Sequence, residues 1–299
     1  MGYLFLSFAL AAGLAKGFCG KKISGSTQTL ADASLINLLR MAFCVLIGAC
    51  LMLAGGVIPF ADFDAPTILA AALSGIFTSV FVVTWLISVR SGAYVMLDVF
   101  LMLGVSVTVS CCRIFFGEEI RPNQVIGFVI LVVAAYIMCS YNISLNGRMT
   151  VGKLGLLLLC GAANGFVDFS QKLFVYHAPN GNVAEFNFYT YLFSALTLLF
   201  VFVFLKLRES SAGGERVAAS MKRAIPYVAV MAVCLFLNSY FKTLAAARLD
   251  SAVLYPLNQG LALMLSMIMA AVFFKERITA RCVIGLCLAF GGLLIINLL

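Results

Sequence analysis

The chain has 299 residues and a net charge of +8, and 63% of its residues are hydrophobic while only 11% are charged. Its mean hydropathy is +1.09. Soluble domains contain about 45–50% apolar residues, so a water-soluble fold could not cover this much apolar surface. The basic residues are dispersed, with no basic stripe, which argues against nucleic acid as a partner.

Hydropathy predicts an all-α integral membrane protein. The apolar runs are roughly twenty residues long, the length of a membrane helix, whereas a membrane β-barrel alternates over about ten. About ten spans are expected, in chain order at 2–20, 33–57, 66–89, 92–116, 122–142, 152–175, 183–206, 224–247, 251–274 and 280–299. The first lacks a basic leading region, so we expect a span and not a removable signal peptide. The polar connection at 206–223 is expected to be a loop or an interfacial helix.

The lysines and arginines outside the spans predict an orientation. Most of them follow odd-numbered spans, and a group of them lies in residues 206–223. The positive-inside rule then places the odd connections in the cytoplasm and both termini outside. We expect a multi-pass protein of the cytoplasmic membrane, in contact with the lipid bilayer.

An internal repeat is the strongest pattern in the sequence. Residues 115–120 read FFGEEI and residues 273–278 read FFKERI, an offset of 158 positions. Phe18 and Lys21 in the first span pair more weakly with Phe169 and Lys172 in the sixth. The repeat predicts two five-span halves, 1–145 and 149–299, that form one membrane domain.

Five is an odd number, so the second half is expected to cross the membrane upside down relative to the first. Such an inverted repeat gives alternating access a physical basis, because exchanging the conformations of the halves exposes a site between them to each side in turn. The sequence therefore favours a transporter.

The repeated motif resembles that of the drug/metabolite transporter superfamily, in its EamA-type ten-helix branch. That family has a Phe-x-x-Glu-(Arg or Lys)-(Ile or Leu) turn and then a helix with an early glycine in both halves. The second copy matches through Phe274, Glu276, Arg277, Ile278, Gly285, Gly291 and Gly292. In the first copy Glu119 replaces the usual basic residue, and Glu118 and Glu276 are expected to be structural.

The resemblance implies a small-molecule transporter with a central cavity lined mainly by spans one, three, four, six, eight and nine. The family often has a proline before the repeated turn. Pro256 fits this pattern, and its first-half counterpart is Asp98. The resemblance does not specify a substrate, because the superfamily moves amino acids, sugars, nucleotide sugars and drugs.

Ionisable residues inside spans normally face a partner or a watery cavity, because a charge at the bilayer centre costs roughly 2.5–3.5 kcal/mol. Asp98 starts a polar edge on the fourth span and is expected to accept a proton or a substrate ammonium, with a structural ion pair as the alternative. Asp168 shares a face of the sixth span with Asn164, and with Lys172, which could instead form an intrahelical pair with it.

The basic residues each leave more than one reading open. Arg40 could bind a carboxylate or phosphate bidentately, or anchor the second span to a neighbour. Lys242 shares a face with Asn238 and could meet an anionic group, pair with Asp98 or snorkel to the surface. Lys16 is equally open, and Gly13, Gly17 and Gly20 around it indicate close helix packing.

The ninth span contains a polar cluster of Tyr255, Asn258 and Gln259 beside Pro256, which could free backbone carbonyls for a ligand. Trp85, the only tryptophan, is either an interfacial anchor or a stacking platform. With the residues above, these complete the predicted substrate site.

We expect no cofactor, no metal site and no enzymatic activity, because the sequence shows no Walker-type loop, Ser-His-Asp set or metal-ligand spacing. The predicted function is secondary transport of a small polar metabolite, amino-acid-like or otherwise charged, coupled to an ion or proton or by exchange. One alternative is a carrier of nucleotide sugars or phosphorylated metabolites, gripped by Arg40 and Lys242. A membrane enzyme acting on lipid-linked substrate, with Asp98 or Asp168 as general base, is an alternative of another class.

Overall fold

The computed structural model describes the chain except for residues 25–28, 59, 61–63, 92–93, 119–120, 147–149, 209–213, 276–279 and 299. Ten helices account for nearly all described residues, among which no strand occurs. They are α1 (Gly2–Ile23), α2 (Leu30–Ala54), α3 (Ala65–Ser91), α4 (Tyr94–Phe116), α5 (Pro122–Asn146), α6 (Val151–His177), α7 (Val183–Arg208), α8 (Gly214–Ala246), α9 (Ser251–Phe273) and α10 (Ala280–Leu298). The predicted all-α fold is confirmed.

Each predicted span corresponds to one helix. Within the described residues, α1 to α4 and α6 to α9 are long and apolar enough to cross a membrane, and α5 and α10 contain the shorter apolar helices Pro122–Ala134 and Val283–Gly292. Several boundaries differ from the prediction by up to four residues, and the start of α8 differs by ten. Helix α2 begins earlier because the Thr29 hydroxyl accepts from the Asp32 backbone N–H and the Asp32 carboxylate accepts from that of Thr29. Helix α8 begins at Gly214, so the later part of the expected polar connection continues into α8.

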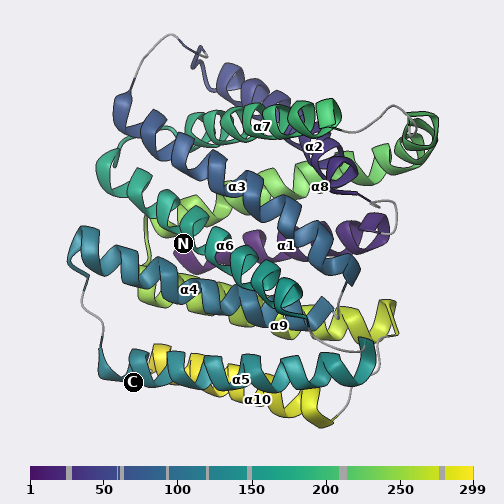
Figure 1. Cartoon of the computed structure of the whole chain (residues 1–299). Coiled ribbons are helices and arrows are strands. Elements are labelled where there is room, and N and C mark those ends of the chain that lie inside the picture. Colours follow the sequence, from purple (N-terminus) through teal and green to yellow (C-terminus); the bar gives the residue numbers. More distant parts are fainter. Residues whose placement is uncertain are drawn as a thin grey trace.

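The helices lie side by side, and successive helices run in opposite directions across the molecule (Figure 1). Helices α5 and α10 pack together at one edge of the bundle and α2 and α7 at the other. Both chain ends lie on the same side. This placement agrees with an even number of crossings.

The packing of the helices is symmetric when five is added to each helix number. Helix α1 packs on α8 as α6 packs on α3, and α4 packs on α6 as α9 packs on α1. The pairs α2 with α7, α4 with α9 and α5 with α10 map onto themselves. A two-fold axis that exchanges two five-helix halves produces this pattern. The division at residues 145 and 149 stays a prediction.

Aromatic contacts repeat the symmetry at both ends of the bundle. The Phe169 ring lies 5.4 Å from that of Phe115 and 5.7 Å from that of Phe116, centroid to centroid. Phe18 makes the corresponding contacts at 5.5 Å with Phe273 and 5.7 Å with Phe274. The sequence match of Phe18 to Phe169 therefore reflects equivalent positions. Of the repeated motif, Glu119, Ile120, Glu276, Arg277 and Ile278 lie outside the described residues.

Helices α4 and α6 approach until their backbones touch. A Cβ added at Gly104 would lie 2.0 Å from the Gly161 carbonyl oxygen, and one added at Gly165 would lie 2.3 Å from that of Gly104. The Thr108 hydroxyl donates to the Gly165 carbonyl at 2.9 Å. Such small-residue contacts are a common way to join membrane helices. This close contact, the α4–α6 seam, fixes the relative position of the two helices that carry Asp98, Asn164 and Asp168.

Candidate functional site

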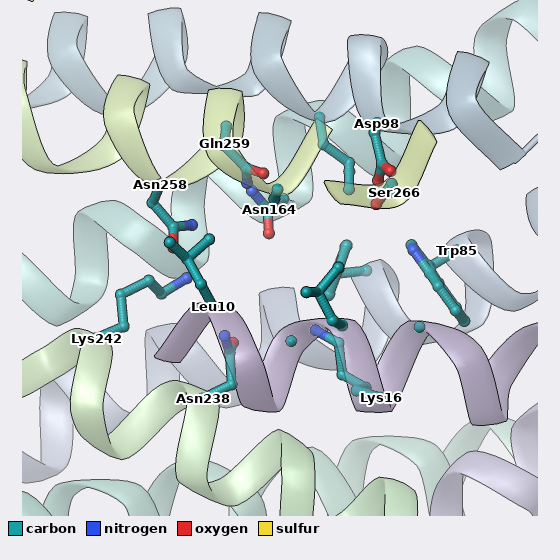
Figure 2. Close-up of a pocket in the computed structure, with 16 residues that line it drawn as sticks. Leu10, Lys16, Trp85, Asp98, Asn164, Asn238, Lys242, Asn258, Gln259 and Ser266 are labelled. Atoms are coloured by element: carbon teal, nitrogen blue, oxygen red, sulfur yellow. The ribbon is translucent and has the colours of Figure 1, made fainter. Parts of the chain in front are cut away.

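A cavity of about 70 Å³ lies between α1, α3, α4, α6, α8 and α9, the six helices that the family resemblance implies (Figure 2). Three of these helices belong to the first half and three to the second. The cavity therefore lies where the halves meet.

Seven of the ten predicted site residues line this cavity. The charged and aromatic ones are Asp98, Lys242 and Trp85. The amide side chains are Asn164, Asn238, Asn258 and Gln259. Figure 2 shows Asp98 and Gln259 on one side of the opening, with Lys16 and Asn238 across from them. These seven positions, far apart in the sequence, thus meet around one cavity, whose lining also includes apolar residues.

Asp168 and Tyr255 lie behind the wall of the cavity, and both are fully buried. The Lys242 ammonium, which does line the cavity, lies 2.5 Å from Asp168 Oδ1. The Tyr255 hydroxyl donates to the backbone carbonyl of Asp168 at 2.7 Å. These contacts join α6, α8 and α9 directly beneath the cavity. The predicted placement of Asp168 and Tyr255 on the substrate-facing surface is therefore not what the structure shows.

This ion pair decides between the readings left open for Lys242 and Asp168. Lys242 pairs with Asp168 instead of Asp98, and it does not snorkel, being 6% exposed. Lys172 does not pair with Asp168 along α6. Its ammonium lies 3.8 Å from Glu118 Oε1 and donates to the carbonyls of Leu249 and Ala246. The Lys172 side chain therefore links α6 to Glu118 just after α4 and to the backbone at the end of α8.

Arg40 is buried on α2 but does not line the cavity. Its Nε atom has no hydrogen-bond partner in the described part of the chain. Nearby Asn37 donates to the carbonyls of Ala33 and, across to α3, Val82. The structure therefore does not place Arg40 beside Lys242 as a phosphate grip.

Trp85 is buried at one end of the cavity, 5% exposed, and is not an interfacial anchor. Its ring packs on α1, where a Cβ added at Gly20 would lie 2.5 Å from two ring carbons. At Gly13 an added Cβ would lie 3.1 Å from the Asn238 amide nitrogen, which donates to the Ala9 carbonyl at 2.7 Å. The small residues of α1 thus admit Trp85 from α3 and Asn238 from α8.

Two amides on the cavity wall retain hydrogen-bonding capacity. Asn164 Nδ2 and Asn258 Oδ1 are buried and make no hydrogen bond to any described group. One is a donor and the other an acceptor. Buried polar atoms normally have a partner, so both are positioned to bind a solute or water.

The comparisons with known proteins agree with this architecture. Residues 153–298 match the model of the EamA-like transporter family. This second half of the chain belongs to the family, within the drug/metabolite transporter superfamily. A solved crystal structure is similar over 98% of this chain and 97% of its own, with a TM-score of 0.66 and 16% identity, which shows a shared fold. No curated protein matches the sequence.

The EamA-like match indicates a transporter, and the long apolar helices indicate a multi-pass membrane protein. The matched segment includes α8 and α9 and nearly all of α6, which supply Asn164, Asn238, Lys242, Asn258 and Gln259 to the cavity. The residues that α1, α3 and α4 contribute lie outside that segment. The contribution of these three helices to the site therefore rests on the structure and its internal symmetry, and not on the family match.

Lys16 and Ser266 are cavity residues that the sequence-based site omitted. The Lys16 ammonium lies 5.8 Å from the centre of the Phe81 ring and within electrostatic reach of Asp98, Asp168 and Lys242. A lysine within an apolar span was the available signal, but the role of Lys16 was left open and only the surrounding glycines were assigned to packing. Ser266 gave no comparable signal, because a serine in a membrane helix often bonds its own backbone.

Proposed function

We propose that this EamA-like protein is a secondary transporter of a small solute that carries both a carboxylate and an ammonium group, as an amino acid does. The observation that carries the proposal is the cavity between the halves, where Lys16 lies across from Asp98 and Lys242 lies at the end beside Asn258. Solute binding there, followed by exchange of the two half conformations, would move the solute across the membrane.

The charge balance supports an anionic group on the solute. Lys16, Arg40 and Lys242 supply three cations to the cavity and its surroundings, against the carboxylates of Asp98 and Asp168. Basic side chains that outnumber the carboxylates favour a solute that brings a carboxylate of its own. The solute carboxylate would lie near Lys242 and its ammonium near Asp98, so that each solute charge meets an opposite one.

The size of the cavity supports a small solute. About 10–15 Å³ of cavity volume holds one water molecule, so a cavity of 70 Å³ has room for about five to seven water molecules. An amino acid is of this size, whereas a nucleotide sugar is several times larger. The absence of Arg40 from the lining weakens the phosphate-binding alternative further.

Thermal stabilisation of the purified protein tests this proposal. Each amino acid and a set of nucleotide sugars are added separately, because a ligand that binds only the folded state stabilises it by about 2.7 kcal/mol at a hundred times its Kd. We expect selected amino acids to raise the Tm, and Asp98→Asn to abolish the increase. The matched control is Asp250→Asn, at an exposed aspartate that makes no capping hydrogen bond to α9.

Stabilisation by nucleotide sugars alone would favour the phosphate-carrier alternative. Stabilisation by amino acids that persists in Asp98→Asn would remove Asp98 from the site. Either result contradicts the binding mode described above.

A further inference from the structure

In the ion pair between Lys242 and Asp168, a solute in the cavity could contact Lys242 but not Asp168. Lys242 lines the cavity, whereas Asp168 is fully buried behind the wall. Lys242 Nζ donates a hydrogen bond to Asp168 Oδ1 at 2.5 Å, and Asp168 Oδ2 has no hydrogen-bond partner among the described residues. A solute carboxylate that binds the Lys242 ammonium therefore competes with Asp168.

We propose that Asp168 is a proton-binding site that couples transport to a proton, taking up a proton when the solute carboxylate takes Lys242. This inference rests on the proposed function and assigns its coupling ion. In this step the Lys242–Asp168 contact is replaced by a contact between Lys242 and the solute carboxylate. A proton from solvent forms an O–H bond at Asp168, so the carboxylate that has lost its contact with Lys242 becomes a neutral carboxyl group.

The energetic reason is the cost of an uncompensated buried charge. Removing one partner of a buried ion pair costs about 3–5 kcal/mol, because the other charge stays in a low-dielectric interior. Protonation removes that cost, since a neutral carboxyl group needs only hydrogen-bond partners. When the solute leaves, Lys242 returns to Asp168 and the proton is released.

The other groups around Asp168 leave Lys242 as its controlling partner. Lys16 on α1 is the second cation within electrostatic reach of Asp168. Tyr255 on α9 is bound to the Asp168 backbone carbonyl. From α4 the cavity receives Asp98, which lies across from Lys16 and acts on it, and from α3 it receives the uncharged rings of Phe81 and Trp85. On α6 itself, Lys172 is engaged by Glu118 and two carbonyls.

The test is proton uptake by the purified wild-type protein in weak buffer. The probe is an equimolar mixture of the twenty standard amino acids, adjusted to the same pH, with a pH indicator to report the change. The mixture alone is titrated as a blank, and thermal stabilisation in the same sample reports binding. We expect uptake of about one proton per bound solute.

Two variants assign the proton to Asp168. Asp168→Asn is expected to abolish uptake, and Asp168→Asn/Lys242→Met removes both charges together so that no unpaired charge threatens folding. Asp250→Asn is expected to keep the wild-type uptake.

The two readouts separate this inference from the proposed function. Stabilisation without proton uptake in the wild type overturns the coupling and leaves amino-acid binding intact. Uptake that persists in both Asp168 variants overturns the assignment to Asp168. An absence of stabilisation by the mixture overturns the proposed solute class, and the coupling with it.

Discussion

Replacing Lys242 with methionine is expected to lower the free energy of unfolding by about 3–5 kcal/mol at a pH where Asp168 stays ionised, because it leaves that carboxylate buried without its cation, and by less where Asp168 takes up a proton. Methionine retains much of the length and apolar contact of the lysine stem, so lost packing contributes little. Asp168 is fully buried, and Lys242 Nζ is the partner that its side chain has in the structure. The expected loss is therefore far above the 0–1 kcal/mol of a surface ion pair.

The double variant Lys242→Met/Asp168→Asn is expected to recover most of that stability. Unfolding of the four proteins in a double-mutant cycle would be followed in detergent micelles, and the coupling between the two sites extracted from it. Lys206→Met, at an exposed lysine near the end of α7, is the matched control and is expected to be nearly neutral. A single variant as stable as the wild type, or a double variant no better than the single, would contradict the ion pair.

Replacing Gly161 with alanine is the second change with a large expected effect. An added Cβ would lie 2.3 Å from the Phe100 carbonyl oxygen, a backbone atom that cannot move aside without shifting α4. Overpacking of this kind costs about 1–3 kcal/mol. Because α4 carries Asp98 and α6 carries Asn164, separating the two helices should also abolish stabilisation by amino acids.

Gly155→Ala on the same helix is the control for that prediction. No heavy atom lies within 4 Å of a Cβ added at Gly155. There alanine should be neutral or stabilise by about 0.4–1 kcal/mol, since it reduces the conformational freedom of the unfolded chain. Melting curves that move in the same direction for Gly155→Ala and Gly161→Ala would show that the α4–α6 seam is not as close as described.

The helices and their order could be predicted from the sequence because both depend on local patterns. Long apolar runs indicate membrane helices, and the repeated motif with its Phe18 and Phe169 counterparts indicates the internal symmetry. The start of α2 was placed at 33 instead of Leu30, although Thr29 and Asp32 have the spacing of a capping box. The start of α8 was missed because residues 214–223 are polar, and hydropathy does not register a helix that continues beyond the membrane.

The site could be predicted only in part, because hydropathy shows which polar residues enter the membrane but not what they face. Asp98 and Lys242 were identified from their charge, whereas the partner of Lys242 depends on how α6 and α8 pack. Asp168 and Tyr255 occupy positions as polar as those of the cavity residues, yet both turn behind its wall. Arg40 shows the same limit. Its place within an apolar span did not tell whether its side chain faces the cavity or lies elsewhere among the helices that pack on α2.

The most direct measurement of the central claim, alternating access of this cavity, is counterflow in proteoliposomes. Vesicles preloaded with a mixture of unlabelled amino acids are diluted into a trace of the same mixture in labelled form. Transient accumulation of label in wild-type vesicles, and none with Asp98→Asn or without protein, is the predicted result. Wild-type vesicles that accumulate no more label than protein-free vesicles would contradict the transport of amino acids through this cavity.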